Sequence, residues 1–365
     1  MARSACRAAD VTDAITQANS GTTPVRAGYE IDAARLAAWM EANVDGFAGP
    51  LTIEQFKGGQ SNPTYKLITA TASYVLRRKP PGELLKGAHA VEREARAMTG
   101  LGNAGFPVPR VYGICTDGDV IGTWFFVMEM VEGRIFWDAT FPEVPRDHRP
   151  AYFDAMNATI AQLHKVDYEA VGLGDFGKPG NYFTRQIGRW SKQYLADEEA
   201  GRDEDMDRLV AWLPGNIPAG DETSIVHGDF KVDNMIFHPT ESRVIAVLDW
   251  ELSTLGHPLA DFAYNAMMYR VPPNIVAGLE GADLAALNIP SEDEYVAAYC
   301  RRMGRDGIPN WDFYVAFQFF RLASIFHGIK GRVIRGTASN TQARERAEAY
   351  PRLARLAVGA MEKCN

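Results

Sequence analysis

The spacing of apolar residues separates a strand-rich first part of the chain from a helix-rich second part. Apolar residues recur at helical spacing over 31–44, and from 51 to 78 short apolar runs alternate with glycine and proline, which is typical of strands. Helical spacing returns over 91–101, and the runs at 108–115 and 123–133 indicate two more strands. We therefore expect about a hundred residues to form a small sheet with a helix packed on it.

The second part of the chain follows another pattern. Beyond residue 131 the apolar spacing is mostly helical, with one pair of strands at 235–248. Residues 1–28 are small and polar without periodicity, as in a flexible arm. We predict an α+β protein with a flexible N-terminal arm over 1–28, an N-terminal lobe over 29–130 and a helical C-terminal lobe over 131–365.

Composition and charge narrow the classes of partner. The 365 residues include 38 Lys and Arg against 46 Asp and Glu, a net charge of −8, which argues against a nucleic-acid-binding surface. No apolar run approaches the roughly 18 residues of a transmembrane helix, and the N-terminus lacks the apolar core of a secretory signal. The 4 cysteines form no pair at metal-ligand or redox spacing, which is typical of a reducing compartment. We expect a cytoplasmic protein with a small-molecule substrate and neither a nucleic-acid nor a membrane partner.

One stretch of polar residues carries the strongest chemical indication. The sequence HGDFKVDN places Asp229 five residues before Asn234, which opens one apolar strand, and Asp249 closes the next. A hairpin between these strands returns both ends to the same side, so Asn234 and Asp249 should lie side by side with Asp229 close by. An amide and a carboxylate oxygen suit Mg²⁺, and the remaining carboxylate can accept a proton from an attacking hydroxyl. This arrangement favours phosphoryl transfer, with His227 bracing the loop.

The same residues carry a resemblance to a known family. HGD followed by Asn, and a strand ending in LDWE, resemble the aminoglycoside phosphotransferase-like branch of the protein-kinase superfamily. The segments VLRRKPPG and RQIGRW look like kinase-like domains associated with acyl-CoA dehydrogenases. The resemblance implies a two-lobed protein-kinase-like fold, ATP as phosphoryl donor, catalytic Asp229, and Mg²⁺ held by Asn234 and Asp249. Asp261 matches the residue that braces the catalytic loop in that family, and it is equally placed to cap a helix.

A glycine-rich turn in the first lobe fits a phosphate-covering loop. Gly58, Gly59, Ser61 and Asn62 lie between two expected strands. Glycine there allows the backbone to approach phosphate oxygens closely. We therefore expect these four residues to bind the nucleotide, with a plain hairpin turn as the alternative interpretation.

The resemblance implies further nucleotide contacts. Arg77 stands where the family usually has a lysine, with Arg78 as an alternative occupant, and an arginine keeps the charge while changing its geometry. Glu94 matches the helix glutamate that pairs with this cation. Glu129 and Val131 match the segment whose backbone groups contact the adenine.

Local charge suggests the class of acceptor. Arg185 and Arg189 lie four residues apart on one expected helix, and 313–344 contains Arg321 and other cations but no Asp or Glu. Charge-assisted hydrogen bonds from Arg185, Arg189 and Arg321 could select a carboxylate or phosphate, and the same field would repel a polycation. We therefore predict a hydroxy acid or hydroxyacyl-CoA as acceptor, with a solvated basic face as the alternative interpretation.

Other functions remain open at this point. A nucleotide-binding pseudokinase or regulatory module is one, because Arg77 replaces the usual lysine. An aminoglycoside kinase is another, disfavoured by the basic helices. Protein kinase activity is less favoured, because no activation segment ending in Ala-Pro-Glu follows LDWE. The intact set of Asp229, Asn234 and Asp249 favours an active enzyme.

Overall fold

The computed structural model of the chain describes residues 20–57, 62–82, 89–338 and 343–364. These residues form two compact units. The sheet unit comprises Met1–Trp137, Glu169–Gly174 and Val232–Ser253. The helical unit comprises Asp138–Tyr168, Asp175–Lys231 and Thr254–Asn365. The hairpin that follows the HGD motif thus belongs to the sheet unit, although it lies deep in the second part of the sequence.

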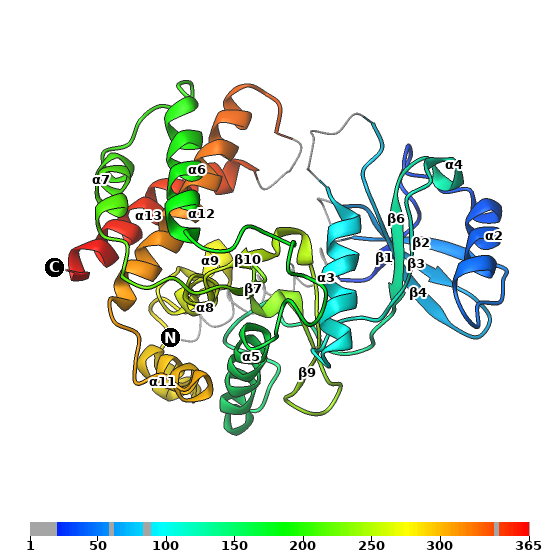
Figure 1. The fold of residues 1–365 in the computed structure, drawn as a ribbon, viewed down its shortest axis with the longest axis horizontal. Coiled ribbons are helices and arrows are strands. Elements are labelled where there is room, and N and C mark those ends of the chain that lie inside the picture. The colour runs from blue at the N-terminus through cyan, green and yellow to red at the C-terminus, as the bar shows by residue number, and fades with distance from the viewer. Residues whose placement is uncertain (1–19, 58–61, 83–88, 339–342, 365) are drawn as a thin grey trace, which may run out of the picture. The chain divides into compact units, whose positions relative to one another are not determined.

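The sheet unit is built on one antiparallel sheet. Its strands run in the order β1-β2-β3-β4-β6-β5, and neighbours pair antiparallel throughout (Figure 1). The strands are β1 (Thr22–Thr23), β2 (Thr52–Phe56), β3 (Thr64–Ile68), β4 (Ser73–Arg78), β5 (Val111–Cys115) and β6 (Phe125–Glu129). β1 lies inside the predicted flexible arm, where the backbone of Arg26 also donates to the side chain of Gln55 at 3.0 Å. The strand forms there because β2 would otherwise leave its backbone groups unpaired at the sheet edge.

Two helices cover opposite faces of this sheet. Figure 1 shows α2 (Ala33–Asn43) on one side and α3 (Val91–Asn103) on the other, with the short α4 (Gly118–Ile121) beside α2. The α2 side of the sheet carries a buried cluster that includes Leu36, Tyr65 and Leu76. Because side chains alternate along a strand, the residues of β4 next to Leu76 face α3 instead. This alternation decides which of two neighbouring arginines reaches the site.

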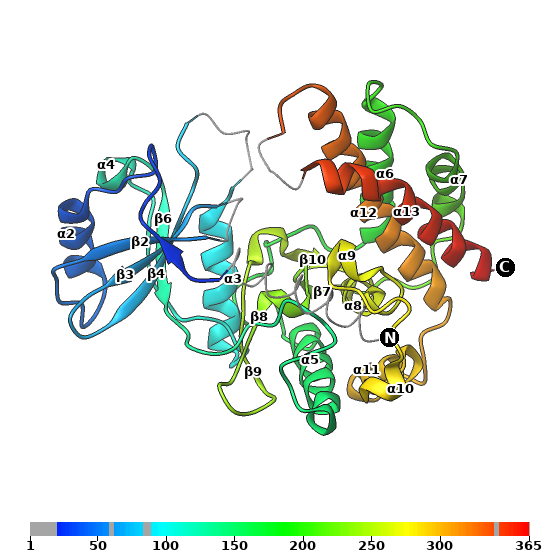
Figure 2. The same cartoon turned by 180° about the vertical axis from the view of Figure 1, so that it is seen from behind.

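A hairpin completes the sheet unit (Figure 2). β8 (Met235–Phe237) pairs antiparallel with β9 (Val244–Val247), and the 3₁₀ turn η4 (Trp250–Leu252) follows. The ring of Trp250 is 1% exposed and packs edge-on against Phe106, with ring centroids 5.8 Å apart. The backbone of Val247 donates to the carbonyl of Pro107 at 2.9 Å. These contacts anchor the end of the hairpin to the segment that follows α3.

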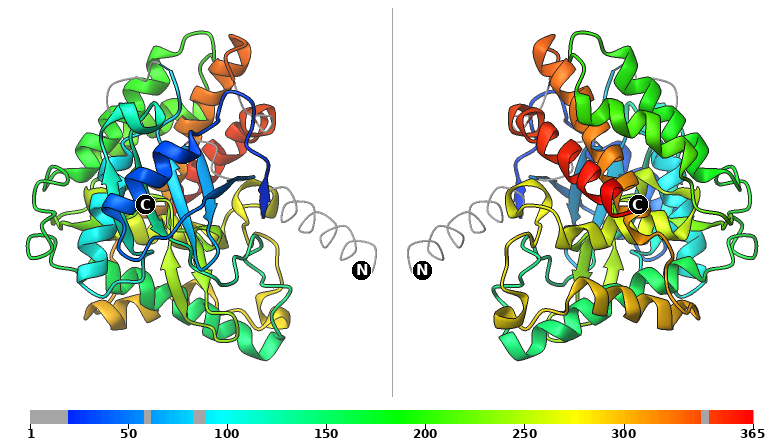
Figure 3. Two further views of the ribbon diagram at one scale, coloured as in Figure 1. Left: turned by 90° about the vertical axis from the view of Figure 1, so that its right-hand side faces the viewer. Right: turned by 90° about the vertical axis from the view of Figure 1, so that its left-hand side faces the viewer.

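The helical unit has a small two-stranded sheet and a group of packed helices. β7 (Ser224–Val226) pairs antiparallel with β10 (Thr254–Gly256). The helices are α5 (Arg149–His164), α6 (Tyr182–Ala196), α7 (Glu204–Trp212), α8 (Pro258–Ala266), α9 (Pro273–Val276), α10 (Leu284–Leu287), α11 (Glu292–Met303), α12 (Trp311–Ile334) and α13 (Ala343–Met361). Its 3₁₀ turns are η1 (Arg146–His148), η2 (Leu213–Gly215), η5 (Met267–Tyr269) and η6 (Glu362–Cys364), whereas η3 (Val232–Asn234) belongs to the sheet unit. Figure 3 shows α12 in orange beside α13 in red.

The core of the helical unit surrounds α8. Every residue of Pro258–Ala266 is buried, and α12 packs against α6, α8 and α13. The rings of Phe262 and Tyr299 stack with centroids 3.8 Å apart and planes 8° from parallel. A buried helix holds its polar side chains in fixed positions, because each one must find a partner inside the protein. α8 is therefore a rigid support for whatever its polar residues contact.

The predicted α+β class is confirmed. An N-terminal antiparallel sheet precedes a largely helical C-terminal part. Within the described parts of the chain, none of the helices combines the length and apolar character needed to cross a bilayer.

Candidate active site

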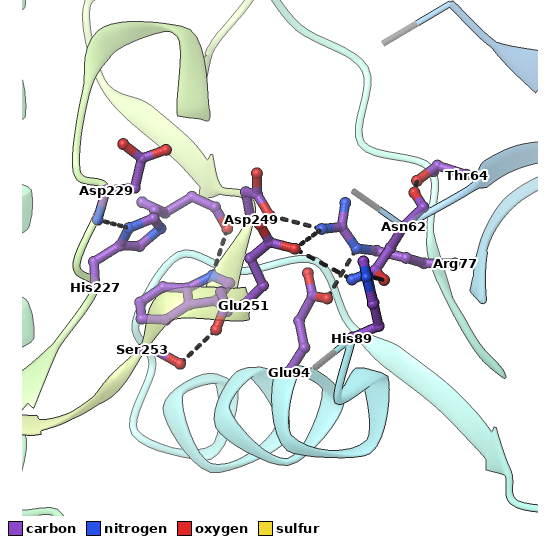
Figure 4. Close-up of polar contacts among 12 residues, drawn as sticks. Asn62, Thr64, Arg77, His89, Glu94, His227, Asp229, Asp249, Glu251 and Ser253 are labelled. Atoms are coloured by element: carbon purple, nitrogen blue, oxygen red, sulfur yellow. Dashed lines mark hydrogen bonds and ion pairs between the residues drawn. The ribbon is translucent and has the colours of Figure 1, made fainter. Parts of the chain in front are cut away.

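One buried arginine organises the polar residues of the sheet unit. Arg77 on β4 places its Nε 2.8 Å from Glu94 Oε2 on α3, and its Nη2 2.6 Å from Asp249 Oδ1 (Figure 4). The same Nη2 lies 3.5 Å from Glu251 Oε2. We call Arg77, Glu94, Asp249 and Glu251 the Arg77 cluster. It joins strand β4, helix α3 and the turn after β9 through a single guanidinium.

The Arg77 cluster holds more negative than positive groups. Burial disfavours the charge on Arg77, but its three carboxylate neighbours more than offset this and raise the pKa of Arg77 above its usual value. Burial also raises the pKa of Glu94, and the charges of Asp249 and Glu251 act in the same direction, while Arg77 opposes them. The surplus of carboxylates would be relieved by a further cation.

The alternative between Arg77 and Arg78 is settled by the pleat of β4. Arg78 points to the other face of the sheet, where its guanidinium lies 5.4 Å from the ring centroid of Tyr65. Its Nη1 donates to the carbonyl of Ile121. Arg77 is therefore the cation that pairs with Glu94, as the resemblance implies.

Asn62 lies at the edge of the same cluster. Its side chain is fully buried, its Nδ2 donates to Glu251 Oε2 at 3.3 Å, and its Oδ1 lies 3.0 Å from His89 Nδ1 (Figure 4). The amide thus connects the end of the glycine-rich turn to the Arg77 cluster. The other predicted residues of this turn, Gly58, Gly59 and Ser61, lie outside the described residues.

The hairpin brings Asn234 and Asp249 to the same end of its two strands. Met235 is paired with Val247, and the backbone of Leu248 donates to the carbonyl of Asn234 at 2.8 Å. Asp249 has φ 65° and ψ 62°, a left-handed conformation that is uncommon outside glycine and is often found at functional sites. Its side chain remains 34% exposed although it contacts Arg77.

The donor atoms at this hairpin end fit Mg²⁺ rather than a softer metal. They are an amide and a carboxylate, both hard oxygen donors, beside a cluster with surplus negative charge. Among the residues that the structure describes, no group of three or more His, Cys, Asp or Glu could hold a metal ion. A two-residue donor set suits Mg²⁺, which usually retains water and phosphate ligands.

The predicted adenine-contacting residues lie at the end of β6. Glu129 is the last residue of this strand, and its backbone N–H donates to the carbonyl of Arg110 at 2.8 Å. Its side chain accepts from the backbone of Arg110 at 3.2 Å. Val131 follows two residues later and is half-buried. The backbone N–H of Glu129 is thus already bonded within the sheet unit.

The HGD loop belongs to the helical unit and is held by α8. The carboxylate of Asp261 accepts from the backbone N–H of His227 at 2.7 Å and from that of Gly228 at 2.8 Å. Gly228 has φ 83°, which a side chain would strain, so the motif requires glycine there. Asp261 therefore braces this loop.

The cap of α8 is a different residue. His257 occupies the N-cap position, and its Nδ1 accepts from the backbone of Leu259 at 3.2 Å. Asp261 instead lies 3.3 Å from His164 Nε2, whose other ring nitrogen contacts the hydroxyl of Tyr299 at 2.8 Å. Burial would raise the pKa of Asp261, but the hydrogen bond and charge of His164, together with His227, hold it below its usual value. Asp261 is thus ionised and paired behind the loop.

Asp229 is contacted through its carboxylate from two directions. The hydroxyl of Tyr264 on α8 donates to Oδ1, and Lys231 Nζ lies 3.7 Å from Oδ2. The backbone of Asp229 donates to His227 Nδ1 at 3.2 Å, so His227 supports the loop (Figure 4). His227, Gly228 and Asp229 are therefore held in place by contacts within the helical unit alone.

The three arginines predicted for acceptor binding have different surroundings. Arg321 is only 8% exposed, and its Nη2 donates to the carbonyl of Gly228 at 2.8 Å. Arg185 on α6 donates to the carbonyls of Gly180 and Lys178. Arg189, one turn further along α6, is exposed and lies over the neighbouring Trp190 ring at 4.9 Å. The structure thus brings Arg321 to the HGD loop and leaves Arg189 on the surface.

Sequence reasoning missed several residues of these two regions. Glu251 was overlooked although it stands two residues after Asp249. Tyr264 and Asn265 were overlooked although they follow Asp261 at three and four residues, the spacing of one helix face. That spacing was the available signal.

Comparison with known proteins identifies the family. A profile of the phosphotransferase enzyme family (APH) matches residues 52–314, which is more than half of the chain. The chain belongs to the APH phosphotransferase family. Its fold is the protein-kinase-like fold of that family, with an N-terminal antiparallel sheet followed by a largely helical part.

Several relatives of this APH-family chain are longer than it is. It is 44% identical over 339 residues to acyl-CoA dehydrogenase family member 10 of Mus musculus, covering 92% of this chain and 32% of the relative. It is 42% identical over 326 residues to acyl-CoA dehydrogenase family member 11 of Rattus norvegicus, covering 87% of this chain and 42% of the relative. The chain therefore spans less than half the length of either relative.

Solved structures of similar proteins support the fold. A protein from Ralstonia eutropha with a provisional aminoglycoside phosphotransferase assignment is 49% identical, with a TM-score of 0.85 over 92% of this chain and 99% of that one. A choline kinase from Cryptosporidium parvum has a TM-score of 0.61 at 11% identity, over 91% of this chain and 99% of that one, and this likeness concerns the fold alone.

Proposed function

We propose that this APH-family phosphotransferase transfers the γ-phosphoryl group of Mg²⁺-ATP to a hydroxyl of an anionic small molecule. The observation that carries the proposal is the double contact of Arg77, which pairs with Glu94 at 2.8 Å and with Asp249 at 2.6 Å. A pseudokinase would have no need to keep this ion pair together with an intact set of Asp229, Asn234 and Asp249.

The proposed roles divide between the two units. Asp229 would orient the acceptor hydroxyl and accept its proton as the new P–O bond forms. Asn234 and Asp249 would hold Mg²⁺, which when bound neutralises charge on the transferring phosphates. Arg77 would contact phosphate oxygens, with Glu94 fixing its direction. The chain itself links base and metal site, since Asn234 follows Asp229 by five residues.

Further nucleotide contacts complete the proposal. The turn containing Gly58, Gly59 and Ser61 would cover the phosphates, and Asn62 would tie that turn to Glu251 through the 3.3 Å hydrogen bond. The backbone at the end of β6 and at Val131 would contact the adenine, with Glu129 contributing its carbonyl rather than its N–H, which is bonded to Arg110.

The proposed acceptor is a hydroxy acid or a hydroxyacyl-CoA. Arg189 offers an exposed cation on α6, and Arg185 and Arg321 donate to neutral carbonyls, which leave their positive charges in place. The relatives named as acyl-CoA dehydrogenase family members support an acyl-type acceptor. Because α6 carries this charge, a polycationic acceptor is disfavoured.

The experiment is a mass-spectrometric acceptor screen. Protein and Mg²⁺-ATP are incubated with hydroxy acids, hydroxyacyl-CoAs and an aminoglycoside, with Asp229→Asn as the blank. A phosphorylated anionic product that is absent from the blank supports the proposal. A phosphorylated aminoglycoside would overturn the acceptor class, and AMP-PNP binding without transfer to any acceptor would favour the pseudokinase.

A further inference from the structure

We propose that Tyr264 is a positioning residue that fixes the carboxylate of Asp229, so that Oδ1 is held by the tyrosine hydroxyl and Oδ2 takes the acceptor proton. This inference rests on the proposed function, since it assigns a role to a residue behind the base. Tyr264 lies on α8, 35 residues from Asp229 in sequence, and both residues belong to the helical unit.

One face of α8 contacts four consecutive residues of the HGD loop. Asp261 accepts from the backbone of His227 at 2.7 Å and of Gly228 at 2.8 Å. One turn later Tyr264 donates to the Asp229 carboxylate, and Asn265 Nδ2 donates to the carbonyl of the next loop residue at 3.2 Å. These three hydrogen bonds of Asp261 and Asn265 fix the backbone of the loop. Tyr264 is the member of this face that contacts the side chain of the proposed base.

Tyr264 is itself held in one orientation. Its side chain is 8% exposed, and the guanidinium of Arg321 on α12 lies 5.3 Å from its ring centroid. Arg321 is fixed in turn by its 2.8 Å hydrogen bond to the carbonyl of Gly228. The next residue, Asn265, accepts from the hydroxyl of Tyr295 at 2.6 Å. Because the Tyr264 ring is anchored on the buried helix α8 and packs against the buried Arg321, its hydroxyl has little freedom to turn away from Asp229.

The hydroxyl of Tyr264 remains protonated, and therefore a donor, at any pH at which the enzyme would work. Burial, and after it the charge of Asp229, raises the pKa of Tyr264 well above its usual value. A protonated phenol can only donate to an ionised carboxylate, so the direction of this hydrogen bond is fixed. A carboxylate has two equivalent oxygens, and a strong donor on one of them selects the other for proton transfer. Lys231 Nζ lies 3.7 Å from Oδ2, beyond hydrogen-bond distance, whereas the Tyr264 hydroxyl is hydrogen-bonded to Oδ1. Loss of the hydroxyl should therefore slow the chemical step more than it weakens substrate binding.

The test compares two buried tyrosines from the same region. Tyr264→Phe removes the donor to Asp229 and keeps the ring. Tyr269→Phe is the matched control, because Tyr269 lies three residues beyond the end of α8, is 9% exposed, and its hydroxyl has no hydrogen-bond partner among the described residues. ADP formation from Mg²⁺-ATP is followed with hydroxy acids and hydroxyacyl-CoAs as acceptors, and with water alone. AMP-PNP binding is measured by calorimetry.

We expect Tyr264→Phe to lower kcat about 10- to 100-fold, because the base loses its fixed orientation, with KM for ATP and AMP-PNP affinity within about twofold of wild type. Tyr269→Phe should match wild type in kcat, in KM for ATP and in AMP-PNP affinity. In the double variant with Asp229→Asn, Tyr264→Phe should cause no further loss, because the oriented base is already gone. This lack of additivity separates positioning from a general effect on the fold.

Different results overturn different claims. Wild-type kcat in Tyr264→Phe would overturn the role of Tyr264 while leaving the proposed function in place. A further loss in the double variant, or loss of AMP-PNP binding in Tyr264→Phe, would mean that the tyrosine supports the fold rather than the base. Absence of transfer by the wild-type protein would overturn the proposed function and this inference with it.

Discussion

The two polar regions of the molecule are built on different principles. In the sheet unit, the Arg77 cluster joins its elements by opposite charges, with three carboxylates around one guanidinium. In the helical unit, the HGD loop is held mainly by hydrogen bonds that its backbone donates to Asp261 on α8, and by one from the Tyr264 hydroxyl to the Asp229 carboxylate. The first arrangement can change partners when a charged ligand binds, whereas the second fixes one geometry in advance. Chemistry that depends on a positioned base benefits from the second, and recognition of phosphates and metal from the first.

The largest effect is expected from the proposed base. Asp229→Asn should reduce phosphoryl transfer by about 10³-fold, because an amide cannot accept the hydroxyl proton. The proposed nucleotide contacts lie in the other region, so AMP-PNP affinity measured by calorimetry should stay within about twofold of wild type. A variant that retains a tenth of wild-type transfer would contradict the role of Asp229.

The next effect concerns the metal. Asp249→Asn should weaken the apparent Mg²⁺ affinity at least about 10- to 100-fold, because it removes the charged member of a two-residue donor set. Mg²⁺ titrations of AMP-PNP binding measure this directly. Asp119→Asn, the same charge change at an exposed position of the sheet unit, is the control and should leave the titration unchanged. An unaltered titration in Asp249→Asn would contradict the proposed Mg²⁺ site at this hairpin.

Arg77 can be exchanged for lysine, the residue that the family resemblance leads us to expect at this position. Arg77→Lys should raise KM for ATP roughly 3- to 10-fold, because an ammonium cannot hold Glu94 and Asp249 with separate nitrogens. Arg77→Met should lower the free energy of unfolding by about 3–5 kcal/mol, because it leaves buried carboxylates without their cation. Arg78→Lys alters the neighbouring arginine on the opposite face of β4 and should leave KM for ATP unchanged. Equal effects at both positions would contradict the distinction between the two faces.

The stability of the helical unit should depend on pH through His257. Burial, opposed in part by Glu222, lowers the pKa of His257 to about 4. The neutral His257 ring contributes fully to the free energy of unfolding above its usual pKa of 6.5. This contribution is lost as the pH falls towards 4, by about 3 kcal/mol in total. Denaturation at several pH values should show this loss in the wild type. His257→Asn keeps an N-cap side chain without a titrating ring, so its stability should vary less between pH 4 and 6.5. If the free energy of unfolding had the same pH dependence in both proteins, the lowered pKa of His257 would be contradicted.

The sequence predicted local features better than long-range contacts. The order of Asp229, Asn234 and Asp249 indicated a hairpin with two of them at one end, because strand pairing and a short turn are local properties. The choice between Arg77 and Arg78 needed the structure, since only the pleat of β4 shows which face each side chain occupies. Tyr264 escaped notice because its partner lies 35 residues away.

Charge counting along the chain was a poorer guide. The basic segments identified Arg185, Arg189 and Arg321 as equivalent cations, but the structure buries Arg321 against the HGD loop and bonds Arg185 to carbonyl oxygens of its own helix start. Arg335, another cation of the basic segment 313–344, pairs with Asp197 at 2.7 Å. A sequence lists charges but not their partners, so a count of cations includes residues such as Arg335 that already pair with a carboxylate.

The central claim is a single in-line transfer from ATP to the acceptor, with Asp229 as base. The stereochemistry at phosphorus tests it directly, using ATP made chiral at the γ-phosphorus with oxygen isotopes and the anionic acceptor found in the screen. One direct displacement predicts inversion of configuration in the phosphorylated product. Retention would require two displacements through a phosphorylated intermediate on the protein, and would contradict the assignment of Asp229 as a base.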